Sequence, residues 1–395
     1  MKIAQRLSVA IFYAGLVGRT PVVSAQAPAE IPQRVASEFL RLADRRVLPP
    51  EPSAGAYAAA YCGAAQVVVL YERPFRVALY DSTGRRLWLQ TRQRPTDSIR
   101  CNDDTIALLE RGDGWSIQLL RLTNGRERAG ATIETMVGDH VALLGWTGEA
   151  WALEVLTRFS NTGVVEASPF QRRTVRLFNP RDNTVAPAFS RVDSTPQVVP
   201  KVGGGGSRLP VRPPFAPTPS IAVDRRGRFF TSTGRERAVE IVDASGARTA
   251  SIALPDTAPP RSSAQISQLI AQWHRTFRAV WPDSLRAQAV ALDEGWHRVI
   301  VGQLLTSRTG VLLAQRRDFE DNPLSRDAER LFDVFDATGR LRGRLRVPIG
   351  TTIMDVTDDA VLAIRRLSGP LNAGTQVIIA SLQMTDSTAR DSVRE

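Results

Sequence analysis

The stretch Phe332-Asp-Val-Phe-Asp-Ala-Thr-Gly339 decides the fold, because its pattern returns along the chain. Phe332 and Val334 alternate with Asp333, as in a half-buried β-strand, and Phe335 then precedes the second aspartate. The Asp-Ala-Thr-Gly segment then suits a tight turn, since aspartate can cap backbone amides and glycine allows positive φ. Residues 340–347 follow as a returning strand, so the stretch predicts a β-hairpin.

Looser copies of this hairpin occur at residues 75–84, 117–125, 175–182 and 239–246, each followed by an outgoing strand. A second kind of hairpin precedes the hairpin at 332–339 and each of its copies, and it occurs a sixth time after them. It has a short first strand, a small or polar turn and a strongly apolar second strand. We find it at residues 60–70, 99–109, 135–144, 221–230, 304–313 and 353–362.

Two successive hairpins make a four-stranded antiparallel unit, and such units repeated around an axis make a β-propeller. We therefore expect an all-β fold, a six-bladed β-propeller over residues 57–383. The sixth unit has a third strand at residues 376–382 but no fourth strand. We expect residues 46–56 to supply it, because this would close the ring and remove an exposed sheet edge.

The Asp-x-x-Gly hairpins resemble those of six-bladed propellers of the NHL and TolB-like kind, above all in exported bacterial proteins. The resemblance covers nearly all of residues 57–383. It implies a fold and does not imply an activity.

The N-terminal residues predict export. Lys2 and Arg6 precede an apolar stretch at 7–17, and Val23-Ser-Ala-Gln-Ala27 offers small residues for cleavage after Ala25 or Ala27. The apolar stretch is too short to span a bilayer, and no later segment is apolar enough to do so. We expect a signal peptide at 1–25 and a soluble, monomeric product in the periplasm or outside the cell, without stable membrane insertion.

Other segments depart from the repeat. Residues 26–56 are expected to hold an amphipathic helix at 30–45 and the segment that closes the propeller. Residues 192–219 form a Pro- and Gly-rich loop between units three and four. Apolar residues recur at helical spacing between Ile266 and Val280, which predicts a helical insertion within residues 256–297, between blades four and five. The tail at 384–395 is expected to be disordered.

The charge does not indicate a nucleic-acid partner. The 395-residue chain has a formal net charge of +11, carried almost wholly by arginine. These arginines are scattered among acidic residues, as in Arg225-Arg226 beside Asp224. A nucleic-acid-binding protein would gather them on one face.

Cys62 and Cys101, which are the two cysteines of the chain, occupy equivalent positions in neighbouring units. In an exported protein this predicts one disulfide. The alternative is two reduced, buried cysteines.

The sequence carries no catalytic motif that we can assign. His140, His274 and His297 lack metal-ligand spacing, and neither a His-Glu-x-x-His nor a Gly-x-Ser-x-Gly motif is present. The candidate residues for the mouth of the propeller channel are Asp103, Asp104, His140, Asp224 and Asp355, with Asp139 and Asp358 beside them. Clustered carboxylates could bind Ca²⁺, and the alternative is that they cap turns. We predict no cofactor.

Two functions remain open. The first is a binding or scaffold module for a protein, peptide or glycan. The second is a hydrolase or lyase, metal-dependent, that acts on a sugar or lactone in the channel. Carboxylates that converge on a metal would favour the second.

Overall fold

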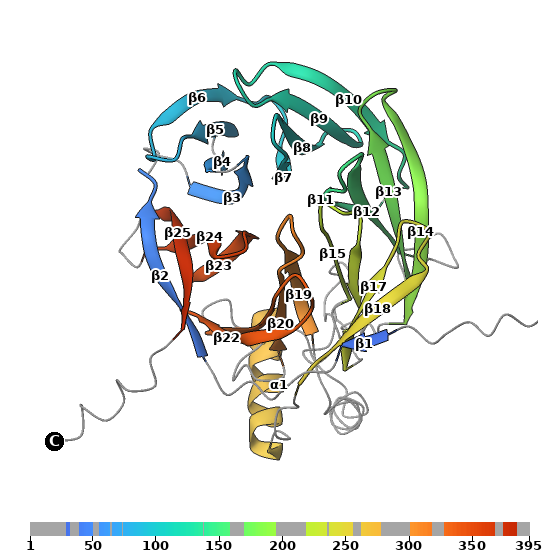
Figure 1. Ribbon diagram of the computed structural model, residues 1–395, viewed down its shortest axis with the longest axis vertical. Coiled ribbons are helices and arrows are strands. Elements are labelled where there is room, and N and C mark those ends of the chain that lie inside the picture. The colour runs from blue at the N-terminus through green and yellow to red at the C-terminus, as the bar shows by residue number, and fades with distance from the viewer. Residues whose placement is uncertain are drawn as a thin grey trace, which may run out of the picture.

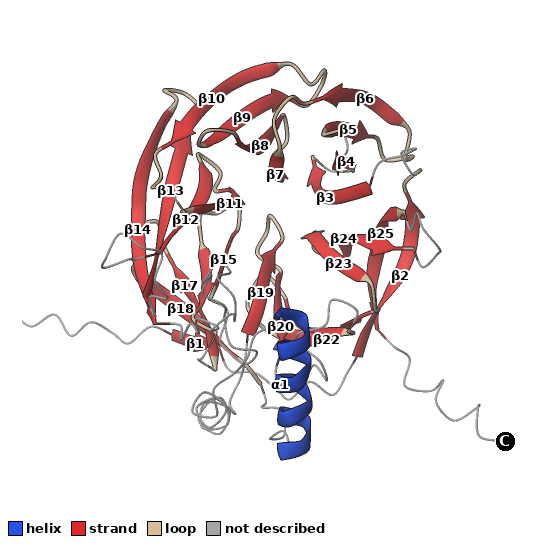
Figure 2. Cartoon of the chain, turned by 180° about the vertical axis from the view of Figure 1, so that it is seen from behind, coloured by secondary structure: helices blue, strands red, loops and turns tan. Residues whose placement is uncertain are grey.

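The computed structural model of the protein describes residues 29–31, 39–49, 55–63, 65–72, 74–136, 138–158, 170–194, 219–234, 237–255, 262–277, 301–317, 328–367 and 374–384. Within these ranges the fold is nearly all β, with one helix, α1 (Ser263–Phe277) (Figure 2). No helix in these ranges has both the length and the apolar character to cross a membrane. The expected signal peptide lies outside the described residues.

Most strands form antiparallel sheets of consecutive chain segments. The first sheet contains β3 (Gly55–Cys62), β4 (Gln66–Glu72), β5 (Arg76–Tyr80) and β6 (Arg86–Thr91). The second contains β7 (Thr96–Cys101), β8 (Thr105–Arg111), β9 (Trp115–Arg121) and β10 (Glu127–Ile133). The third contains β11 (His140–Trp146), β12 (Trp151–Arg158), β13 (Phe170–Asn179) and β14 (Thr184–Ser194).

The next sheet contains β15 (Ser220–Val223), β16 (Phe229–Ser232), β17 (Ala238–Val242) and β18 (Arg248–Ala253), with β1 (Ala29–Ile31) parallel to β18 at its edge. The last sheet has eight strands and two antiparallel runs. One run is β19 (Val301–Thr306), β20 (Leu312–Arg316), β21 (Arg330–Phe335) and β22 (Leu341–Val347). The other is β23 (Thr351–Val356), β24 (Ala360–Arg366), β25 (Thr375–Met384) and β2 (Phe39–Val47).

These runs stand around a central opening as the blades of a β-propeller (Figure 1). The first strand of each run, which we call its inner strand, lies next to the opening. Contacts pass from inner strand to inner strand and return to the start, in the order β3, β7, β11, β15, β19, β23 and β3.

The core lies between neighbouring runs. Val68 of β4, for example, packs with Ile106 and Leu108 of β8. Each blade is covered on both faces by its neighbours, so β4 and β8 are buried along nearly their whole length. This explains why their sequences are continuously apolar and do not alternate.

The Asp-x-x-Gly turns are built as the sequence predicts. The Oδ1 atom of Asp336 accepts hydrogen bonds from the backbone N–H of Thr338 (2.9 Å) and of Arg340 (3.0 Å). Gly339 has a φ of 83°, in the left-handed region that glycine adopts without strain. The corresponding turn at Asp81 has the same bonds, and a hydrogen bond from the Thr83 hydroxyl (2.6 Å) lowers the pKa of Asp81 to about 2.

The chain closes through β2, which corrects two expectations. Phe39–Val47 pairs antiparallel with β25 and, at Phe39 and Leu40, parallel with β22. The expected helix at 30–45 is wrong for the described residues, and the closing strand precedes the expected 46–56, overlapping it only at Arg46 and Val47. Edge pairing with β25 outweighs helix propensity here, because it satisfies the backbone and buries Leu40.

The third unit also begins later than expected. Residues 135–144 do not form its first hairpin, because β11 starts at His140 and turns back only after Trp146. The small, polar residues before His140 make a turn in which Asp139 Oδ2 accepts the Met136 N–H (2.8 Å). The apolar run at 141–144 is therefore part of the inner strand.

Helix α1 lies between β18 and β19 in the chain, within the expected insertion at 256–297. The rest of that insertion, and residues 195–218 of the Pro- and Gly-rich segment, lie outside the described residues. So do residues 385–395 of the expected tail, while Met384 is the last residue of β25 and pairs with Leu40. Residues 192–194, which were expected to begin the Pro- and Gly-rich loop, are instead the end of β14, where they pair with β13.

Candidate functional site at the mouth of the central cavity

A cavity of about 310 Å³ lies where the inner strands end. Its wall combines apolar residues, such as Trp146, Ile221 and Leu304, with charged residues. The main charged residues of this wall are Arg100, Arg225, Arg308, Asp355, Asp358 and Asp359.

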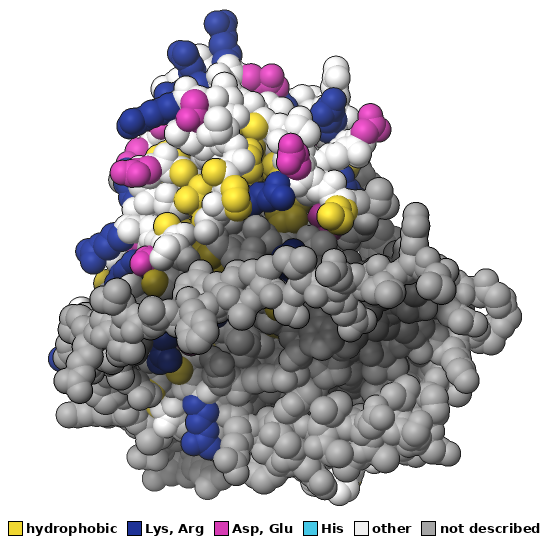
Figure 3. Space-filling view, turned by 90° about the vertical axis from the view of Figure 1, so that its right-hand side faces the viewer, with side chains coloured by type: hydrophobic (Ala, Val, Ile, Leu, Met, Phe, Trp, Pro, Cys, Tyr) yellow, Lys and Arg dark blue, Asp and Glu magenta, His cyan; other side chains and the backbone are white. Residues whose placement is uncertain are grey.

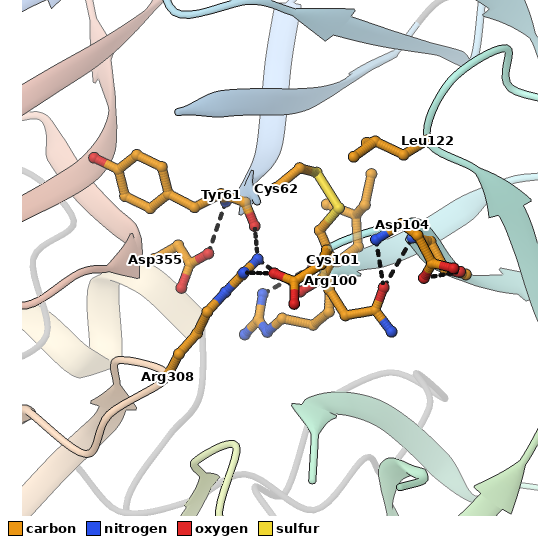
Figure 4. The surroundings of a disulfide bond; sticks show 12 residues. Tyr61, Cys62, Arg100, Cys101, Asp104, Leu122, Arg308 and Asp355 are labelled. Carbon is orange, nitrogen blue, oxygen red and sulfur yellow. Dashed lines mark hydrogen bonds and ion pairs between the residues drawn. A yellow bond between two sulfur atoms is a disulfide. The ribbon is translucent and has the colours of Figure 1, made fainter. Parts of the chain in front are cut away.

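The predicted disulfide between Cys62 and Cys101 is confirmed, and it forms part of this region (Figure 4). It links the last residue of β3 to the last residue of β7, so it ties two neighbouring inner strands together where they reach the cavity. Cys62 is fully buried, and Cys101 lies on the cavity wall.

Loss of this disulfide should lower the free energy of unfolding without changing the strands of the blades. The Cys62→Ala, Cys101→Ala double variant should lose about 4 kcal/mol of unfolding free energy, as the chain-entropy model gives for a loop of this length, 39 residues. Dithiothreitol should lower the melting temperature of the wild type and leave that of the variant unchanged. Two titratable thiols in the oxidised, native protein would contradict the prediction.

Arg308 reaches across the mouth of the cavity toward this disulfide (Figure 4). It comes from the turn after β19, which lies opposite β7 in Figure 1. Its Nη2 donates to the carbonyl oxygens of Tyr61 (3.2 Å) and Cys101 (3.4 Å), one on each of the two strands that the disulfide joins. Its Nη1 donates to Asp103 Oδ1 (2.6 Å).

Asp103 is shared between two arginines. Its other oxygen, Oδ2, accepts a hydrogen bond from Arg225, which follows β15. The hydrogen bond from Arg225, helped by the charge of Arg308, lowers the pKa of Asp103 below its ordinary value, so the side chain is a carboxylate at neutral pH. The side chains of Asp103, Arg225 and Arg308 are 52%, 44% and 30% exposed, so these pairs are open to solvent.

The Asp355 carboxylate lies deeper, at the end of β23. Its Oδ2 accepts the backbone N–H of Tyr61 (2.8 Å), and its Oδ1 accepts its neighbour Val356 N–H (2.9 Å). Desolvation by burial raises the pKa of Asp355, although the positive charges of Arg100 and Arg308 oppose the shift. Asp355 therefore lines the wall, and protein donors already hold both of its oxygens.

Asp358 is a further carboxylate of the mouth. Its Oδ1 accepts hydrogen bonds from the hydroxyls of Ser307 (2.8 Å) and Thr309 in the adjacent blade. Asp359 beside it pairs with Arg45 of β2 at 3.0 Å. Within the described part of the chain, no three His, Cys, Asp or Glu side chains come together as a metal-ligating group.

Three of the predicted mouth residues lie elsewhere. Asp224 has a fully buried side chain that caps its own turn through the N–H groups of Arg226 and Arg228. Asp104 faces Arg128 of β10 (3.1 Å) and does not line the cavity. His140 begins β11 at the end remote from the cavity, where its ring meets the edge of Trp115.

The arginines of this site were not identified from the sequence, because arginine is common throughout the chain. A signal was nevertheless present in the repeat. Asn102, Asp224 and Ser307 are equivalent capping residues, each accepting backbone N–H bonds within its turn. The residue after each cap is Asp103, Arg225 and Arg308 respectively. Opposite charges at one repeat position therefore indicate a contact across the mouth.

No family model matches the chain, and no curated protein matches its sequence. A solved structure of a DUF4221 family member from Bacteroides vulgatus is similar at 8% identity and a TM-score of 0.48, over 88% of this chain and 99% of that one. A calcium-binding protein, regucalcin, from Agrobacterium tumefaciens is similar at 11% identity and a TM-score of 0.43, over 88% and 96% of the two chains. BamB from Moraxella catarrhalis is similar at 10% identity and a TM-score of 0.34, over 86% and 99%. At these values the likenesses carry no argument about function.

Proposed function

We propose that the protein is an exported, six-bladed β-propeller that works as a binding or scaffold module for a protein, peptide or glycan. The blade count is supported by the runs of four strands, which are β3–β6, β7–β10, β11–β14, β15–β18, β19–β22 and β23–β25 with β2. The return of the inner-strand contacts from β23 to β3 supports a closed ring.

The state of the cavity carboxylates carries this proposal. Asp355, Asp358 and Asp359 line the cavity, and Asp103 is bonded to two arginines of its wall. Each of the three wall carboxylates accepts hydrogen bonds from the protein itself: Asp355 from two backbone N–H groups, Asp358 from two hydroxyls and Asp359 from Arg45 and Thr357. A general acid and base, or a metal site, needs carboxylates that converge on a common reacting point. A preformed cavity with a mixed apolar and polar wall is suited to holding a ligand.

The alternative is a metal-dependent hydrolase or lyase that acts on a sugar or lactone. The observation that favours it is that Asp355, Asp358 and Asp359 come from one hairpin and line the same cavity. Ca²⁺, which prefers oxygen ligands, would be the metal. Metal analysis and melting curves with added Ca²⁺ or Zn²⁺ separate the two functions, since a bound metal that raises the melting temperature would support the enzyme.

We also propose that residues 1–25 direct export to the periplasm or the cell exterior. The disulfide supports this, because such bonds persist in oxidising compartments. We propose a monomer without a nucleic-acid partner. Acidic and basic side chains are interspersed over the described surface visible in Figure 3, in keeping with that proposal.

A substitution that blocks the mouth of the cavity tests the binding function. Gly63 lines the cavity with a φ of 57°, and a Cβ added there would meet no atom within 4 Å. Gly63→Trp should therefore fill the mouth at a backbone cost of about 1–2 kcal/mol. Gly63→Asn is the matched control, since asparagine tolerates this conformation and adds little bulk.

The measurement is binding of the purified wild type and both variants to peptide and glycan arrays. Ligands should be retained by Gly63→Asn and lost by Gly63→Trp, with similar melting temperatures for the two variants. Ligands that bind Gly63→Trp as well as the wild type would overturn the proposal that the cavity is the binding site.

A further inference from the structure

Three arginines, Arg100, Arg225 and Arg308, line the mouth of the cavity, and the carboxylates that interact with them are Asp103 and the deeper Asp355. Arg225 and Arg308 come from neighbouring blades and share the single carboxylate of Asp103. Arg100 lies on the wall below them. The hydrogen bonds of Arg100 go to backbone carbonyl oxygens, those of Leu144 (3.1 Å) and Ile99 (3.0 Å), which carry no net charge.

The carboxylate of Asp103 is held like a bound ligand. Each of its oxygens accepts from a different guanidinium, and both guanidiniums come from other blades. Its exposure of 52% means that water already reaches the pairs, so replacing Asp103 by another carboxylate desolvates little charge. Solvent-exposed pairs contribute only about 0–1 kcal/mol each, which makes such an exchange inexpensive.

The wall that these arginines share has an apolar part. Trp146, Ile221, Leu304 and Val356 contribute to it, and the last three are almost fully buried in the described structure. A ligand that suits this wall has an apolar body next to its carboxylate. Hydroxyl groups of a sugar acid that lay against these four side chains would lack hydrogen-bond partners there.

We propose that the cavity binds the carboxylate of a peptide with an apolar side chain beside it, by exchange with Asp103 between Arg225 and Arg308. This inference rests on the proposed binding function and names its ligand class. The ligand carboxylate takes the hydrogen bonds of the two guanidiniums, its apolar side chain packs toward Trp146 and Leu304, and Asp103 turns out to solvent. The Asp103 carboxylate therefore competes with the ligand for the two arginines, and this competition sets the affinity of the protein for the ligand.

The test uses calorimetric titration of the full, oxidised protein with N-acetyl-leucine and with N-acetyl-leucinamide, which lacks the carboxylate. The wild type should bind the acid at least about tenfold more tightly than the amide, the size expected for a charge-assisted hydrogen bond. Arg308→Gln should remove most of this preference. Asp103→Asn, which deletes the competing charge and keeps the side-chain shape, should tighten binding of the acid about threefold or more.

Matched controls exist on the outer side of the same turn. Asp104→Asn and Arg128→Gln disrupt a pair of the same kind, 70% and 50% exposed, that does not line the cavity. Both should bind the acid as the wild type does. An equal affinity for acid and amide, the absence of binding to both, or an unchanged or weakened affinity in Asp103→Asn would overturn the inference.

Failure here is distinguishable from failure of the binding function. Array ligands that Gly63→Trp loses, but that carry no carboxylate or bind Arg308→Gln normally, would leave the binding function standing and overturn this ligand class. Galacturonate oligomers serve as a second probe. Preferential binding of these over N-acetyl-leucine would assign the arginines to a sugar acid and would also overturn the peptide proposal.

Discussion

A chain that begins at residue 49 should not fold to a monomeric, cooperatively melting protein. It lacks β2, which is the outer strand beside β25, and Leu48, whose N–H donates to the carbonyl of Val377 (2.9 Å). Leu40 and Leu48 are both 1% exposed in the intact protein, so two core clusters would open. The bare edge of β25 would then be available to pair with other chains. Circular dichroism melting and size-exclusion chromatography measure both effects.

The control for this deletion is a chain that begins at residue 32. It lacks β1, which adds to the outer edge of β18 through the pairs from Ala29 to Ile31. Because β1 closes no gap between blades, this chain should melt cooperatively and remain monomeric. A stable monomer that begins at residue 49 would show that the ring closes without β2, and would contradict the structure.

The Asp333→Ala variant should lose about 3–5 kcal/mol of unfolding free energy, the usual cost of removing one partner from a buried ion pair. Asp333 on β21 is fully buried between Arg316 of β20 and Arg344 of β22. Its two oxygens accept from Arg316 Nη1 at 2.5 Å and from Arg344 Nε at 2.9 Å. The substitution removes this carboxylate from two guanidiniums that have little access to water. Urea denaturation followed by tryptophan fluorescence measures the loss.

An exposed pair in the same blade provides the control. Glu329 and Arg346 lie 3.7 Å apart with side chains 47% and 49% exposed. Glu329→Ala should cost at most about 1 kcal/mol, because water replaces the lost partner. If both alanine variants lost the same small amount, burial would not be what makes the Asp333 cluster important.

The sequence was sufficient for most of the hairpins, because a hairpin is decided largely by neighbouring residues. The turn at Asp336 requires a capping carboxylate and a glycine within four positions, and both can be read directly. The repeat also predicted the disulfide, since equivalent positions in adjacent units lie side by side in any propeller. The sequence failed where local preference and tertiary pairing disagree. Phe39–Arg45 was expected within a helix, yet pairing with β25 makes it part of the strand β2.

The site was predicted only in part, for the same reason. Asp355 and Asp103 were identified because carboxylates near the ends of inner strands could be counted along the chain. Their partners could not be identified in this way, because Arg225 and Arg308 are separated from Asp103 by 122 and 205 residues. Charge at such separations acts only after the ring has closed and has brought the turns of different blades to one mouth.

The sequence by itself therefore determined most of the hairpins, the Asp-x-x-Gly turns and the pair of cysteines. Backbone conformation and repeat position are set within a few residues, so each of these features could be predicted from the local sequence. Only the tertiary structure decided that β2 closes the ring and that Arg225 and Arg308, each one residue after a cap, reach Asp103 across the mouth of the cavity. Asp224 shows the difference: its own turn uses the carboxylate, while the next side chain, Arg225, is left to reach Asp103 across the mouth.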